Sequence, residues 1–118
     1  MEVIAWSQNL TAVRAVEAGA VLVTKEELFR QADVVTIHLV LDRRTRGLVG
    51  APELALMKAT ARLVSTSRGS IVVEADLRAA LRNRKFAGAG IDVFDQEPLP
   101  PDHPFRSPAN LLATPHIG

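Results

Sequence analysis

The chain has 118 residues, of which 47% are hydrophobic, and this suits one compact globular domain. A formal net charge of +1, with acidic and basic residues interspersed, argues against a nucleic-acid or anionic-membrane partner and favours a small molecule. Without cysteine there is no disulfide, thiolate metal site or cysteine nucleophile, so we expect no metal centre and a reducing, cytoplasmic location. No apolar run approaches the roughly 20 residues of a membrane span, and we expect a soluble chain without a leader.

The first part of the chain alternates short apolar runs with helical patterns. We expect strands at residues 3–6, 20–23 and 34–39, separated by helices that end near residue 18 and span residues 25–31. Asn9 or Thr11 can cap the first helix, and Gly19 suits the position after its end. Thr24 and Glu27 form a capping-box pattern at the start of the second helix.

The same alternation continues to the end of the chain. We expect a polar loop at 42–46, a helix from Pro52 to about 57, a strand at 62–65, a helix at 74–84, and strands at 88–93 and 111–113. Prolines between residues 97 and 104 favour an extended connection. The β-branched run at 34–39 suits a strand covered on both faces, and the small residues at 88–90 permit close packing. The order predicts a doubly wound parallel α/β sheet with helices on both faces.

Ligands of such sheets bind at the carboxyl ends of the strands, so the polar residues that follow the strands are the candidate site. These are Ser7, His38, Arg68, Asp92 and His116, with Glu97 slightly further along. Oxidation of a 2-hydroxy acid needs a cation for the carboxylate, a base for the hydroxyl proton and a nicotinamide to take the hydride. Arg68, His116 and Glu97 match these needs. Taken singly, each also has an ordinary explanation as a surface ion pair, an inert histidine or a solvated turn residue, so their joint placement supports the hypothesis.

Three ordered motifs carry a family resemblance. They are S-T-S-R-G-S at 65–70, G-I-D-V-F-D-Q-E-P-L at 90–99 and A-T-P-H-I-G at 113–118, together with A-D-V-V-T-I-H-L at 32–39 and E-L-A-L-M-K at 53–58. The chain resembles the NAD-binding domain of D-isomer-specific 2-hydroxyacid dehydrogenases over essentially its whole length. The resemblance implies a Rossmann-type fold, NAD or NADP as cofactor, and hydride exchange with a D-2-hydroxy acid or its 2-keto acid.

The resemblance also implies roles for individual residues. Arg68 would bind the substrate carboxylate and carbonyl, His116 would exchange the hydroxyl proton, Glu97 would support His116, and Asp92 would hold the nicotinamide carboxamide. Residues implied along the cofactor are Ser7 at the adenosine ribose, His38, Leu39, Val40, Thr66, Ser67, Arg68, Asp92, His116 and Gly118. For His38 an ordinary histidine at the edge of the core remains an equal alternative.

Some positions depart from the family pattern. Ser65 stands where asparagine is usual, and Val40 where proline is frequent. Ser7 replaces the acidic residue that commonly receives the ribose hydroxyls of NAD and repels the extra phosphate of NADP. Gln8 and Asn9 follow it, so no arginine is next to Ser7 to bind a 2′-phosphate, and we expect NAD while NADP stays open.

The sequence contains no G-x-G-x-x-G turn, which normally holds the pyrophosphate. The resemblance therefore implies that residues 1–118 are a partial nucleotide-binding domain, without the first strand-helix unit and without the substrate-binding domain. In the doubly wound order that first strand lies centrally, so we expect a gap or two unpaired strand edges, with pairing to another chain as one remedy and a homo-oligomer as its result. Alone, the chain is expected to bind cofactor weakly or not at all and to have no useful turnover.

Three classes of function remain open. The leading one is an oxidoreductase of the 2-hydroxyacid class, present as a fragment. The second is a non-catalytic truncated or oligomerising protein of the same fold, and the third, ranked low, is a nucleotide-sensing corepressor resembling the C-terminal-binding proteins. Arg43, Arg44 and Arg46 form a charged loop that is expected to be simply solvated rather than to steer an anion.

Overall fold

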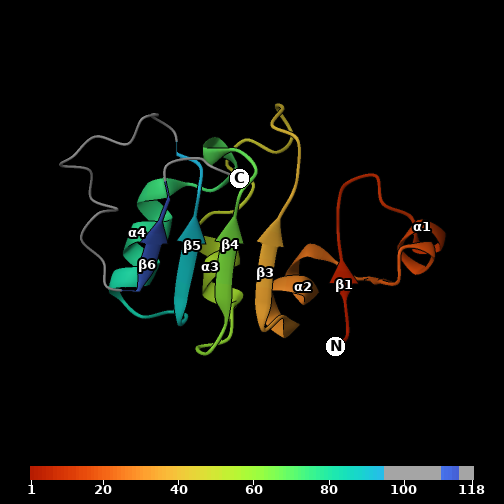
Figure 1. Ribbon diagram of the computed structural model, residues 1–118, viewed down its shortest axis with the longest axis horizontal. Coiled ribbons are helices and arrows are strands. Elements are labelled where there is room, and N and C mark those ends of the chain that lie inside the picture. Colours follow the sequence, from red (N-terminus) through yellow and green to blue (C-terminus); the bar gives the residue numbers. More distant parts are fainter. Residues whose placement is uncertain (95–109, 115–118) are drawn as a thin grey trace.

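The computed structural model describes residues 1–94 and 110–114 of the chain (Figure 1). The elements are β1 (Ile4–Ala5), α1 (Ala12–Glu17), β2 (Val21–Leu22), α2 (Lys25–Gln31), β3 (Val34–Ile37), α3 (Ala51–Leu56), β4 (Arg62–Ser65), the 3-10 turn η1 (Gly69–Ile71), α4 (Glu74–Arg82), β5 (Gly88–Ile91) and β6 (Leu111–Ala113). The predicted order of elements is confirmed. The expected bounds of α2, β4 and β6 are also confirmed, whereas the other elements differ by a few residues at their ends, where hydrogen bonding frays.

The strands form two separate parallel sheets. One contains β1 and β2, with Ile4 opposite Val21, and the other has the order β3-β4-β5-β6. Figure 1 shows the labelled strands pointing the same way, with β1 set apart from β3. The expected discontinuity is thus confirmed, because among the described residues β3 pairs only with β4 and β1 pairs only with β2.

One face of the four-stranded sheet carries the main core. Alternate residues of β3 and β4 are buried, as the period of two in a strand requires, and they pack against residues from the helices. The shared cluster includes Phe29 from α2, Leu54 from α3, Leu77 and Leu81 from α4, and Val35, Ile37 and Leu63 from the sheet. Figure 1 places α3 and α4 behind this sheet.

The opposite face of the four-stranded sheet is open in the described part of the chain. Val34 is 59% exposed, Leu112 is 69% exposed, and Thr36 and Arg62 are exposed as well. The prediction that β3 is covered on both faces, with helices on both faces of one sheet, is therefore wrong for these residues. A β-branched run shows that both faces of a strand are suited to burial, but a second layer has to be supplied by other parts of the polypeptide.

Local signals in the sequence are confirmed where they involve short-range geometry. Gly19 has a φ of +82° directly after α1, a conformation that glycine adopts without strain. The Thr24 hydroxyl accepts the Glu27 N–H at 3.1 Å, and the Glu27 carboxylate accepts the Thr24 N–H at 3.2 Å, which completes the capping box. A Cβ on Gly88 would lie 2.8 Å from the Asn110 carbonyl oxygen, so this strand approaches its neighbour as closely as predicted.

No helix in the described ranges combines the length and the apolar character needed to cross a membrane.

Candidate functional site

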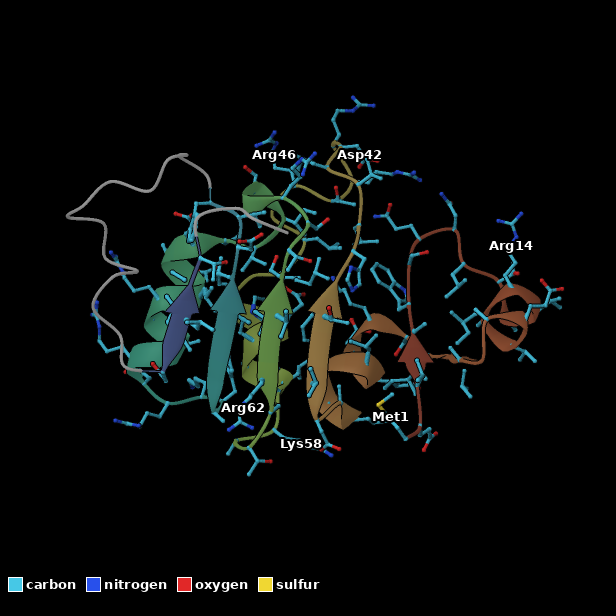
Figure 2. The ribbon with its side chains drawn as sticks, in the orientation of Figure 1. Met1, Arg14, Asp42, Arg46, Lys58 and Arg62 are labelled. Atoms are coloured by element: carbon cyan, nitrogen blue, oxygen red, sulfur yellow. The ribbon has the colours of Figure 1, made fainter. Side chains whose placement is uncertain are left out.

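The structure brings most of the predicted site residues to the carboxyl ends of the parallel strands. Ser7 follows β1, residues 38–40 follow β3, residues 66–68 follow β4, and Asp92 follows β5. Figure 2 shows Asp42 and Arg46 beyond this end of the sheet, with Lys58 and Arg62 at the opposite end. Glu97, His116 and Gly118 lie outside the described residues, so their predicted roles remain predictions.

The loop that carries Arg68 is held against the loop that follows β3. The Ser67 hydroxyl donates a hydrogen bond to the Leu39 carbonyl, and an isolated parallel bridge pairs Val49 with Val72. Backbone bonds of 3.1 Å from the Val49 N–H to the Ile71 carbonyl and 2.9 Å from the Val73 N–H to the Val49 carbonyl extend this contact. The two loops therefore form one framework at the carboxyl ends of β3 and β4.

Arg68 lies on this framework with its side chain exposed. Its Nη1 donates to the Ser67 carbonyl at 2.9 Å, and the rest of the guanidinium remains open to solvent. A guanidinium presents five N–H donors in a planar fork, so the remaining donors can bind a carboxylate through two parallel hydrogen bonds.

Asp92 is held rigidly at the end of β5. It is only 5% exposed, and its Oδ1 accepts a hydrogen bond from the Thr114 hydroxyl that follows β6. Backbone bonds of 3.0 Å from the Asp92 N–H to the Ser65 carbonyl and from the Thr114 N–H to the Ile91 carbonyl fix both residues. Sequence reasoning missed Thr114, although a polar residue directly after the last strand was the signal used for the other positions.

His38 is exposed, and its Nε2 lies 2.9 Å from the Thr36 hydroxyl on the same strand. This bond links residues on one side of β3 and does not distinguish a cofactor contact from a histidine at the edge of the core. Both interpretations of His38 therefore stay open.

A pocket of about 200 Å³ lies between the loops that follow β1 and β3. It is lined by Trp6, Ser7, Gln8, Asn9, Leu39, Val40, Asp42, Arg44, Thr45 and Leu48. Its volume is below the roughly 300–1,000 Å³ of a typical ligand pocket, so it fits one part of a dinucleotide rather than the whole molecule. Apolar walls from Leu39 and Val40 and the Ser7 hydroxyl suit an adenine ring and its ribose.

A rigid turn forms one wall of this pocket. The Asp42 Oδ1 accepts the Arg44 N–H at 2.7 Å and the Thr45 N–H at 3.1 Å. The buried Thr45 hydroxyl donates to the Val40 carbonyl at 2.7 Å. Sequence reasoning missed Trp6, Arg44 and Thr45 as pocket residues, because their proximity depends on how two separate sheets are placed.

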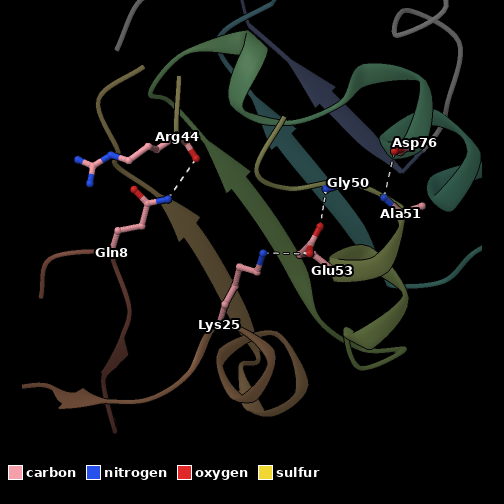
Figure 3. A network of polar contacts seen from close by, with 7 residues as sticks. All are labelled: Gln8, Lys25, Arg44, Gly50, Ala51, Glu53 and Asp76. Carbon is pink, nitrogen blue, oxygen red and sulfur yellow. Dashed lines mark hydrogen bonds and ion pairs between the residues drawn. The ribbon is translucent and has the colours of Figure 1, made fainter. Parts of the chain in front are cut away.

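Contacts between distant segments join the two sides of the pocket. Gln8 Nε2 donates to the Arg44 carbonyl at 3.2 Å, and Figure 3 shows this bond beside the ion pair of Lys25 with Glu53. The Lys25 ammonium also lies 6.0 Å from the centre of the Trp6 ring.

No group of three or more His, Cys, Asp or Glu side chains suited to a metal ion occurs among residues 1–94 and 110–114.

Parallel strands joined by helices, with polar loops around a pocket at their carboxyl ends, define a Rossmann-type nucleotide-binding domain. The family model for the NAD binding domain of D-isomer specific 2-hydroxyacid dehydrogenases matches residues 1–118. The chain belongs to this family, as its motifs indicated.

Individual relatives agree with this assignment. A glyoxylate reductase of Aeropyrum pernix is 47% identical over 100 residues, which cover 85% of this chain and 30% of the relative. A crystal structure of a putative D-3-phosphoglycerate dehydrogenase from Ralstonia solanacearum superposes with a TM-score of 0.93 and 36% identity, over 99% of this chain and 34% of that one. A 2-hydroxyacid dehydrogenase from Xanthobacter autotrophicus in complex with NADPH is 39% identical, with a TM-score of 0.74, over 78% of this chain and 30% of that one. The chain thus spans about a third of the length of these proteins.

Proposed function

We propose that the chain supplies the nucleotide-binding face and the substrate-binding arginine of an oxidoreductase that transfers hydride between NAD(P) and a D-2-hydroxy acid or its 2-keto acid. The observation that carries this proposal is that site residues follow the carboxyl ends of four parallel strands, with a pocket between the loops after β1 and β3. This set of residues at the carboxyl ends of parallel strands is suited to an extended dinucleotide whose reactive ring lies near Arg68.

Different residues of the site bind successive parts of the cofactor, from the adenosine to the nicotinamide. Ser7, Leu39 and Val40 bind the adenosine part, and His38, Thr66 and Ser67 follow the chain of the dinucleotide toward the nicotinamide. Asp92, fixed by Thr114, accepts a hydrogen bond from the carboxamide. When bound, the nicotinamide donates or accepts the hydride.

Arg68 binds the substrate carboxylate, because the planar fork of a guanidinium matches two carboxylate oxygens and carries the opposite charge. His116 exchanges the hydroxyl proton, Glu97 orients His116, and Gly118, which belongs to the same sequence motif as His116, contacts the cofactor. The carboxylate and the adjacent carbonyl define the substrate class, which agrees with the glyoxylate reductase activity named for the Aeropyrum pernix relative.

A first experiment titrates the isotope-labelled chain with NADH and with AMP and maps amide shifts by NMR. Shifts are expected at Ser7, Leu39, Val40 and Thr66, with weak affinity near the millimolar range, about −4 kcal/mol. Thr60, at the opposite end of the sheet, serves as an internal control. Shifts centred on the opposite end, or none at millimolar nucleotide, would contradict the proposal.

A second experiment tests Arg68 in a complete enzyme. This chain replaces the matching segment of the Aeropyrum pernix glyoxylate reductase, and glyoxylate reduction is measured for Arg68→Ala and for the control Arg62→Ala at the opposite end of β4. Loss of two charged hydrogen bonds is expected to lower kcat/KM by about a hundredfold or more for Arg68→Ala and to leave the control unchanged. Equal activity of both variants would rule out the role given to Arg68.

We also propose that the chain associates with itself through β3, which in the described residues has no strand paired on the side away from β4 and has an exposed outer face. Val34 is 59% exposed on this strand, and unpaired strand edges beside apolar side chains favour pairing with another chain. Light scattering is expected to show oligomers that Val34→Lys disperses, whereas Val13→Lys on α1, which is 68% exposed, leaves them intact. A monomeric unmodified chain would exclude this association.

A further inference from the structure

The pocket brings together two segments that are far apart in the sequence. Ser7 and Arg44 line the same pocket, and the neighbouring Gln8 bonds to the Arg44 carbonyl across 36 residues of chain. Figure 3 shows the Arg44 side chain extending from the same backbone position that receives the Gln8 amide. The sequence shows no arginine next to Ser7, but the fold supplies one from the loop after β3.

Ser7 leaves the ribose end of the pocket open to an anion. An acidic residue at this strand end accepts the ribose hydroxyls and repels a 2′-phosphate. A serine hydroxyl carries no charge and can donate to a phosphate oxygen. The strand end therefore lacks the group that normally excludes the phosphorylated ribose.

Arg44 has the chemistry and the freedom to bind that phosphate. Its side chain is exposed, and among the described residues its guanidinium takes part in no ion pair. Its backbone is held on both sides, by Asp42 at the N–H and by Gln8 at the carbonyl. A planar guanidinium on a fixed backbone is well suited to two parallel hydrogen bonds with a phosphate.

Asp42 is the one acidic residue in the lining of this pocket, and it would repel a phosphate. Its Oδ1 is directed at the N–H groups of Arg44 and Thr45 within its own turn. Arg44, unlike Arg43 and Arg46, lines the pocket itself, so its positive charge offsets that of Asp42 at the site.

We propose that Arg44 and Ser7 form a binding site for the 2′-phosphate of the adenosine ribose, so that the pocket prefers NADP over NAD. This inference rests on the proposed dinucleotide site and names the form of the cofactor that the site selects. Arg44 is then a residue that determines cofactor specificity.

The test uses nucleotide fragments that need only this pocket. The whole chain is titrated by NMR at low salt with adenosine 2′,5′-bisphosphate and with 5′-AMP. The bisphosphate is expected to bind about tenfold more tightly, as one charge-assisted contact provides. Arg44→Gln is expected to abolish this preference while retaining 5′-AMP binding. The matched variant Arg46→Gln, with the same change in net charge, keeps the preference, and Ser7→Asp reverses it.

Other outcomes overturn the proposal in distinguishable ways. Equal affinity for the two nucleotides in the unmodified chain excludes a 2′-phosphate site and leaves the adenosine pocket standing. An equal loss in Arg44→Gln and Arg46→Gln, or competition by inorganic phosphate as strong as that of the bisphosphate, reduces the site to general charge attraction. Absence of binding by both nucleotides at millimolar concentration overturns the dinucleotide site itself and this inference with it.

Discussion

The Lys25 ammonium lies 3.2 Å from Oε2 of Glu53 and so joins the first turn of α2 to the first turn of α3. Oε1 of the same carboxylate accepts the Gly50 N–H at 2.8 Å, and the Lys25 ammonium also faces the Trp6 ring. Figure 3 shows the contacts of Glu53 with Lys25 and with Gly50. The pair therefore connects α2 with α3, and the same ammonium lies beside the ring of Trp6, the residue before Ser7.

This ion pair predicts a dependence of stability on pH. Burial raises the pKa of the Glu53 carboxyl. The hydrogen bond from the Gly50 N–H and the hydrogen bond and charge of Lys25 together lower that pKa by more than burial raises it, so it lies below the ordinary 4.5. A lowered folded-state pKa stabilises the fold above pH 4.5, and the contribution is lost as the pH falls through that lower pKa. Glu53→Gln is expected to lose less than about 1 kcal/mol at pH 7 and nothing in strong acid, by urea unfolding. Asp33→Asn, whose partner Lys58 lies 3.0 Å away on the exposed surface, is the control with no expected change.

Replacement of Ser65 by an apolar residue is expected to increase the stability of the fold. The Ser65 side chain is 1% exposed at the end of β4, and its hydroxyl has no hydrogen-bond partner among residues 1–94 and 110–114. A buried polar group without a partner costs about 1–3 kcal/mol. Ser65→Ala is expected to raise the free energy of unfolding by about 1 kcal/mol in denaturant titration. A loss of similar size would show that the hydroxyl has a partner after all.

Replacement of Ser67, two residues further along the chain, is expected to decrease the stability of the fold. The Ser67 hydroxyl bonds to the Leu39 carbonyl and connects the loops after β4 and β3. Ser67→Ala is expected to lower the free energy of unfolding by about 1 kcal/mol and to speed amide exchange at residues 39–41. Exchange that is unchanged at these residues would mean that the backbone bridge of Val49 with Val72 holds the loops by itself.

Two positions with positive φ predict opposite effects of substitution. Gly19 has a φ of +82°, so Gly19→Ala introduces strain and is expected to destabilise by about 1 kcal/mol. Arg84 has a φ of +53° just after α4, and Arg84→Gly is expected to stabilise by a few tenths up to about 1 kcal/mol. Thermal unfolding of the two variants measures both effects, and a shift in the same direction for both would refute the backbone explanation.

Short-range patterns in the sequence predicted most of the fold. Capping by Thr24 and Glu27, the turn at Gly19 and the apolar runs depend on interactions between residues close in the chain, so they can be recognised without coordinates. The failure concerned the faces of β3. Val34 looked like a buried residue because its type suits burial, but its exposure depends on whether another layer covers that face.

The sequence by itself determined the family, the order of the elements and the placement of Ser7, Arg68 and Asp92 after strands, because motifs and periodicity are written in consecutive residues. Only the tertiary structure decided that Thr114 holds Asp92 and that, in the part of the chain that the structure describes, the four-stranded sheet keeps one face open. It also decided that Arg44 shares a pocket with Ser7. These relationships join residues far apart in the chain. They depend on which strands become neighbours and on how the two sheets are placed, and no local sequence pattern carries that information.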